Sequence, residues 1–268
     1  MADKSVMDKL IKFEELLMGA AGTGEDVMPQ LTQILQSVHE NFAEKCGPSY
    51  QMESQRLEGI VAQYRGQCRG LKEQLEKEVV REEYSTGGMT IHRGYYCPSP
   101  VRDIIVGGSS RGRLLKRMTV KSNPAHRYGF NTNDELVIAY TSSAPEIIIR
   151  QGQTELGFLL ASGDHDITTI SESLFRSDGK IASYAYAVCC PGGEKLAVHD
   201  YQKEIYTYSD EGLLEAVDAW ISYTHHKYHF RHDDEGYLSS FTFVELDRNG
   251  EISFEDDRIR EVKIKRKV

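Results

Sequence analysis

The sequence predicts an α+β fold in which an N-terminal helical hairpin or bundle precedes a long antiparallel β-meander of repeated hairpins. Apolar residues at helical spacing over the first eighty residues indicate the helices, and turn signals that recur about every 20 residues indicate the hairpins. We therefore expect a helical module at 1–84, a linker or first strand at 85–103, and a repeated hairpin sheet at 104–268.

Three stretches of the helical module carry the periodicity: 6–17, 27–42 and 57–75. The run AAGTG at 20–24 separates the first two, and the run CGP at 46–48 is expected to end the second. In the third stretch the apolar positions step by four and three residues, which is a short heptad seam. The seam favours either a small bundle packed on the rest of the chain or a homo-oligomer formed through 50–83.

The predicted hairpins share one pattern: a strand of aromatic and β-branched residues, a polar turn, and an aliphatic residue that opens the next strand. Turn pairs such as Asp178-Gly179 and Asn249-Gly250 provide the positive φ that tight hairpins require. Eight aliphatic residues mark the pattern: Leu114, Leu136, Leu156, Ile181, Leu196, Leu214, Leu238 and Ile252.

Two of these segments, YSDEGLL at 208–214 and FRHDDEGYL at 230–238, resemble the YD-repeat (Rhs-type) family. The family motif is an aromatic residue, a short gap, Asp-x-x-Gly and an aliphatic residue two positions on. The resemblance spans roughly 104–256, with copies of uneven length. It implies an extended, twisted antiparallel sheet more strongly than it implies a function.

Charge is distributed unevenly along the chain, whose formal net charge is −9. Residues 85–127 carry 8 basic residues and one acidic residue, whereas 128–257 carry 24 acidic and 8 basic residues, a net of −16. A field of that sign repels nucleic acid and suits a basic partner. The chain has no apolar run of membrane-helix length, a charged N-terminus and five cysteines without framework spacing, so we expect a cytoplasmic protein with no membrane contact.

The favoured function is non-catalytic protein binding, most concretely by an immunity protein that neutralises a cognate basic toxin or effector domain. The acidic turns and their aromatic neighbours would form the interface. The residues expected to bind the partner are Tyr208, Asp210, Glu211, Asp233, Asp234, Glu235 and Tyr237. No cofactor is expected.

Two alternatives stay open. The run His92-Arg93-Gly94 resembles the Arg-containing strand of ADP-ribosyltransferases, and the run at 140–143 resembles their Ser/Thr-rich strand, although no Glu-x-Glu pair follows. This alternative is an enzyme centred on Arg93 and the 107–113 loop, which could form an anion-binding nest. The other alternative is a structural or assembly scaffold.

Two segments are weighed as metal sites. The run ELDRNGEISFED at 245–256 resembles an EF-hand loop, but it begins with Glu, ends with Asp and follows a strand, so an Asn-Gly hairpin is favoured over calcium binding. Its candidate ligands are Glu245, Asp247, Asn249, Ser253 and Asp256. In the cluster THHKYHFRH, His225 and His229 would share one strand face, and His226 and His232 the other; we expect no metal there.

Overall fold

The fold is known from a computed structural model, which describes residues 9, 11–16, 28–88, 92–106, 110–118, 124–141, 144–161, 166–189, 195–196, 201–221, 224–247, 249–263 and 266–268. Within these residues, no helix is long and apolar enough to cross a membrane.

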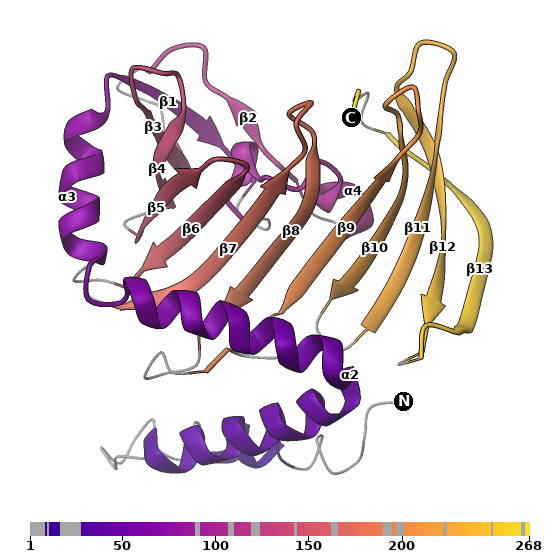
Figure 1. Ribbon diagram of the computed structural model, residues 1–268, viewed down its shortest axis with the longest axis horizontal. Helices are drawn as coiled ribbons and strands as arrows, with labels where there is room; N and C mark the ends of the chain where they lie inside the picture. The colour runs from indigo at the N-terminus through magenta and orange to yellow at the C-terminus, as the bar shows by residue number, and fades with distance from the viewer. Residues whose placement is uncertain are drawn as a thin grey trace.

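The described part of the chain is dominated by a single antiparallel sheet of 13 strands (Figure 1). Its strands are β1 (Arg81–Thr86), β2 (Arg113–Leu114), β3 (His126–Phe130), β4 (Leu136–Thr141), β5 (Ala144–Gln151), β6 (Thr154–Leu160), β7 (Ile167–Phe175), β8 (Ile181–Val188), β9 (Gln202–Tyr208), β10 (Leu214–Ile221), β11 (Thr224–His232), β12 (Leu238–Leu246) and β13 (Ile252–Glu261). From β3 to β13 each strand pairs with the next in the chain, which confirms the predicted meander. β1 is inserted between β3 and the edge strand β2.

Five hairpin turns are built alike, at 131–135, 176–180, 209–213, 233–237 and 247–251. In each, the first amide donates to the fifth carbonyl and the fourth amide donates to the first carbonyl. The fourth residue has a positive φ, and it is glycine in four turns and Asp134 in the other. Glycine is favoured there because it adopts this conformation without steric cost. An aliphatic residue opens the strand after each of the five turns, as predicted.

The predicted hairpin at the start of the array is wrong. Ile104 and Ile105 lie in a short helix, α4 (Arg102–Ile105), rather than in a strand. They pack against a hydrophobic cluster of the sheet, so burial of these side chains decides the local structure. β1 begins at Arg81, so the sheet already includes the last residues of the segment 1–84.

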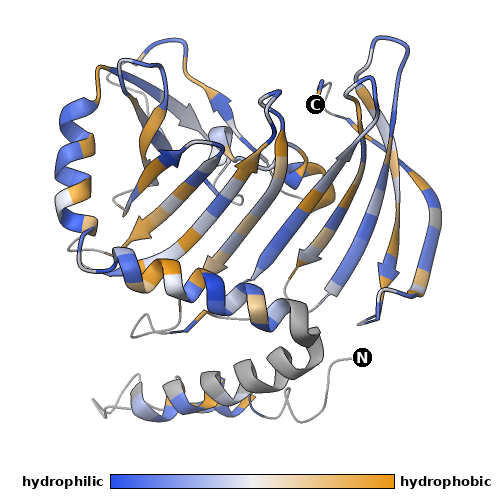
Figure 2. Ribbon diagram, viewed as in Figure 1, coloured by the Kyte–Doolittle hydropathy of each residue, from blue (hydrophilic) through white to orange (hydrophobic). Residues whose placement is uncertain are grey.

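The predicted α+β class with an N-terminal helical bundle is also wrong: the protein is mostly antiparallel sheet, and its helices pack on that sheet. α2 (Met28–Tyr64) is sharply bent, and the arm of it that leads to α3 (Cys68–Glu78) lies with α3 on one face of the sheet, here called the helix face (Figure 1). The heptad seam from Leu57 to Leu75 packs there against residues such as Phe158 and Ile170. The seam is apolar because it meets the sheet, and Figure 2 shows the matching hydrophobic bands on the strands.

The CGP run at 46–48 does not end a helix, because α2 continues through it to Tyr64. Glycine and proline weaken and bend a helix interior without forbidding it, and α2 is sharply bent (Figure 1). Its later turns, with Leu57 and Val61, pack on the sheet. Homo-oligomerisation through 50–83 remains a prediction.

The opposite face of the sheet is covered by residues 92–106, here called the strap, and by residues 262–263 and 266–268 of the C-terminal segment. The strap contains η1 (Gly94–Tyr96) and α4. Its Val101 is fully buried among sheet aromatics such as Tyr184 and Tyr228, and Val262 and Val268 pack on the same cluster. Because neighbouring strand residues point to opposite faces, Tyr184 contacts the strap side while Ala185 contacts the helix side.

Candidate partner-binding surface

The acidic residues expected to bind a partner lie on two turns at one end of the sheet. Turn 209–213 joins β9 to β10 and turn 233–237 joins β11 to β12, so both follow strands that run in the same direction (Figure 1). The turns are neighbours, since a Cβ on Gly236 would lie 3.6 Å from the Leu213 side chain. We name their five exposed carboxylates the acidic rim: Asp210, Glu211, Asp233, Asp234 and Glu235.

One member of the acidic rim also holds its turn. The Asp233 carboxylate accepts hydrogen bonds from the backbone amides of Glu235 at 3.0 Å and Tyr237 at 2.9 Å. Asp210, Glu211 and Asp234 make no ion pair with the part of the chain that the structure describes. The backbone of these two turns is therefore held by hydrogen bonds within the turns, and the carboxylates of the rim project from it.

The two tyrosines expected beside these acids are half-buried. Tyr208 donates to the Ile181 carbonyl at 3.0 Å, and burial raises the pKa of its phenol to about 12. Arg176 and Lys180 of the neighbouring turn lie over its ring. Tyr237 lies under the Lys267 ammonium, 4.8 Å from its ring centroid. Both rings thus contact cations of this chain, and on the Arg176 side these cations weaken the negative field of the rim.

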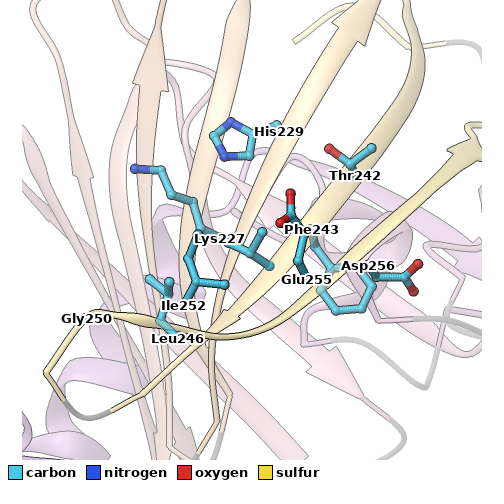
Figure 3. A pocket seen from close by; sticks show the side chains of 10 residues that line it. Lys227, His229, Thr242, Phe243, Leu246, Gly250, Ile252, Glu255 and Asp256 are labelled. Carbon is cyan, nitrogen blue, oxygen red and sulfur yellow. The ribbon is translucent and has the colours of Figure 1, made fainter.

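A groove that the sequence did not point to lies farther along the same strands. It has a volume of about 510 Å³ and is formed by β11, β12 and β13, beyond the part of the sheet that α2 crosses (Figures 1 and 3). Lys227, His229, Leu246 and Ile252 are among the residues that line it. The sequence offered one signal for this groove, the alternation of residue types along β11 and β12. The strands that α2 covers show the same alternation, so the signal does not distinguish an open face from a covered one.

The enzyme-like residues His92 and Arg93 are brought to a buried polar cluster between strap and sheet. Arg93 donates to Glu146 of β5 at 2.7 Å and to Glu155 of β6 at 2.7 Å, and its side chain is only 2% exposed. His92 bridges Glu146 at 2.9 Å and the Tyr184 hydroxyl at 2.8 Å. The guanidinium is thereby held by two carboxylates of its own chain.

The electrostatics of this cluster depend on the guanidinium. Burial by itself raises the pKa of the Glu146 carboxyl, but the charges and hydrogen bonds of Arg93 and His92 hold that pKa well below its usual range. Gly157 makes the space: a Cβ there would lie 2.3 Å from a Glu146 oxygen and 2.6 Å from an Arg93 nitrogen. The arrangement ties the strap to the sheet. Of the expected 107–113 loop, 107–109 lie outside the described residues.

The other arginines of the strap region are used in the same way. Arg102 donates to the buried Glu204 at 3.1 Å. Arg111 contacts the Asp103 carboxylate at 3.2 Å and the Cys97 carbonyl at 2.8 Å, and the C-terminal Arg266 contacts Asp103 at 2.6 Å. Much of the positive charge of 85–127 therefore neutralises carboxylates of this chain.

The histidines of β11 divide between the two faces as predicted. His225 lies 3.3 Å from the Asp218 carboxylate and stacks on Trp220, whereas His226 packs beside Tyr228 and Phe243 on the strap face. Burial lowers the pKa of His226. No three His, Cys, Asp or Glu side chains are grouped to hold a metal within the described residues.

The segment with calcium-loop character is a hairpin, as favoured. The Asp247 carboxylate accepts the amides of Asn249 at 2.8 Å and Glu251 at 2.9 Å, which is the capping that Asp233 provides in its own turn. Asp256 lies farther along β13 and is held by Arg258 at 2.6 Å and Arg260 at 2.8 Å. Glu245 and Ser253 belong to the paired strands, where the Ser253 hydroxyl donates to the Glu245 carbonyl at 3.1 Å.

No protein-family model matches the chain. A search of curated proteins also finds no match.

Proposed function

We propose that this chain is a non-catalytic protein-binding protein that uses the acidic rim to engage a basic partner domain. The partner class we propose is a toxin or effector domain that the chain neutralises in the cytoplasm, as an immunity protein does. The observation that carries the proposal is the gathering of five exposed carboxylates on two neighbouring turns.

Two physical properties support this function. Carboxylates of one sign on a surface steer a basic partner and raise its association rate. The turns are already ordered by backbone hydrogen bonds and by the Asp233 cap, so binding orders little additional backbone. The resemblance of these two segments to YD repeats adds a family in which repeated hairpins present or enclose toxic cargo.

The enzyme alternative is favoured less because the guanidinium of Arg93 is held by Glu146 and Glu155 within the chain. A catalytic arginine contacts the substrate, and this one would have to release two buried carboxylates first.

The test screens domains encoded in neighbouring genes for a basic one that binds, and measures its association rate by surface plasmon resonance at 50 and 300 mM NaCl. We expect Asp210→Lys/Glu211→Lys/Asp234→Lys to lower the rate about tenfold or more at low salt, and less at high salt. Asp233 is left unchanged because it caps its turn.

The matched control reverses three exposed acids far along the chain: Glu14→Lys/Glu15→Lys/Glu73→Lys. This variant has the same net charge as the rim variant. Equal loss in both variants, or no loss in either, would contradict binding through the acidic rim. A partner that still binds after the rim reversal with unchanged salt dependence would assign the interface to another surface.

A further inference from the structure

A second charged surface lies at the opposite end of the strand order, beside β1 and β2. Arg113, Lys116 and Arg117 are exposed there, and none of them makes an ion pair with the described part of the chain. Of the eight basic residues of 85–127, Arg93, Arg102, Arg111 and Arg127 pair with carboxylates, and Lys121 lies outside the described residues.

Lys116 and Arg117 line a groove of about 550 Å³, here called the basic groove, and Arg113 precedes its lining residue Leu114 in β2. Its apolar lining comes from Leu114, Leu115 and Met118, and Met118 is 42% exposed. The β1 side of the groove is formed by residues 81–84. A ligand would therefore meet apolar side chains and positive charge together.

The carboxylates in the basic groove are already engaged. Glu82 accepts hydrogen bonds from Arg127 at 3.0 Å and from the Tyr84 hydroxyl. Glu83 accepts from Arg81 and from the Tyr96 hydroxyl of the strap. Since these acids are satisfied within the chain, the charge left for a ligand is positive.

The backbone at this site is a sheet edge. β2 is the last strand in the order and pairs with β1 through Ser85–Leu114 and Thr86–Arg113. An edge strand offers amide and carbonyl groups to an added strand, and side chains of that strand alternate between its two faces.

We propose that the basic groove binds an acidic, extended segment of a partner protein that adds to the sheet beside β2. Its carboxylates would meet Arg113, Lys116 and Arg117, and its alternate apolar side chains would pack on Leu115 and Met118. The site is separate from the acidic rim, which belongs to the turns of β9–β12, so it does not depend on the proposed function.

A protein segment fits this site better than nucleic acid. The three cations that make no ion pair among the described residues neutralise few phosphates, whereas nucleic-acid affinity grows with every phosphate contacted. The chain as a whole carries a net charge of −9, which repels a long polyanion but only weakly opposes a short acidic peptide.

The experiment uses the full chain and a fluorescein-labelled peptide of alternating Glu and Val, twelve residues long, in anisotropy titrations at 50 mM NaCl. A peptide of alternating Lys and Val and a seven-nucleotide oligothymidine with the same charge as the acidic peptide are titrated in parallel. We expect the acidic peptide alone to bind, and Lys116→Glu/Arg117→Glu to weaken it about tenfold or more. Hydrogen exchange should show new protection at 81–86 and 113–118.

The control Lys77→Glu/Lys263→Glu makes the same change in net charge at two exposed lysines outside the groove, and should bind within about threefold of the parent. Equal weakening by both variants, equal binding of the oligothymidine, or absence of acidic-peptide binding at millimolar concentration would each overturn the proposal. Self-association that Lys116→Glu abolishes, measured by sedimentation without peptide, would instead assign the groove to a second copy of this chain.

Discussion

Replacing Arg93 with methionine should destabilise the protein strongly at neutral pH. The substitution keeps a long apolar stem but removes the guanidinium that contacts Glu146 and Glu155 at 2.7 Å each. Those carboxylates stay between strap and sheet, where their side chains are 5% and 11% exposed. Breaking a buried ion pair by removing one partner costs about 3–5 kcal/mol, so we expect a loss of that order in the free energy of unfolding.

The loss should shrink as the pH falls. In the parent, Arg93 holds the pKa of Glu146 below its unfolded value, so this carboxylate stabilises the fold above a pH of about 4.3 and the contribution disappears in acid. Without the guanidinium, burial raises the pKa of Glu146, and protonation removes the unpaired charge.

The assay is urea unfolding followed by circular dichroism at pH 7.5 and pH 4.5. The control is Arg150→Met, because Arg150 contacts Glu155 at 3.2 Å from a side chain that is 44% exposed, and its loss should cost less than about 1 kcal/mol. A loss below about 1 kcal/mol for Arg93→Met at pH 7.5, or a loss that grows at pH 4.5, would refute the argument that the guanidinium ties the strap to the sheet.

Two further predictions concern the turns and the helix face. Asp247→Ala should lower the free energy of unfolding by about 1 kcal/mol, because it removes the cap of turn 247–251. Addition of 1 mM calcium should change the melting temperature of neither parent nor variant by more than about one degree. A calcium-dependent rise in the parent that is lost in the variant would show a metal site. Leu57→Ala should lower the free energy of unfolding, measured by chemical denaturation, by about 2–5 kcal/mol, because Leu57 is fully buried between α2 and the sheet. Met52→Ala, on the exposed side of α2, should lower it by less than about 1 kcal/mol. Similar values for the two variants would contradict packing of the seam on the sheet.

The candidate site shows where sequence reasoning succeeds. Asp210, Glu211 and Asp233 to Glu235 could be placed on exposed turns because the turn signal is local: a polar cap, a glycine at positive φ and an aliphatic residue that opens the next strand. That the two turns adjoin follows from the meander, which the period of the signal predicts.

Other parts of the site depend on contacts distant in sequence. The charge count suggested a broadly basic segment at 85–127, but Arg93 meets Glu146 and Glu155 more than fifty residues away. Among the described residues of that segment, only Arg113, Lys116 and Arg117 are cations without an ion pair. The groove of β11–β13 was missed because the sequence does not show where α2 stops covering the sheet.

The sequence by itself determined the hairpins of this protein, since strand alternation and turn chemistry act between residues a few positions apart. The tertiary structure decided what covers each face. A heptad seam is apolar whether it meets another helix or a sheet, and here the sheet provided the larger apolar surface, so the helices became one of its covers rather than a bundle. The buried arginines of the strap were fixed in the same way, because carboxylates brought together by the sheet made their burial favourable.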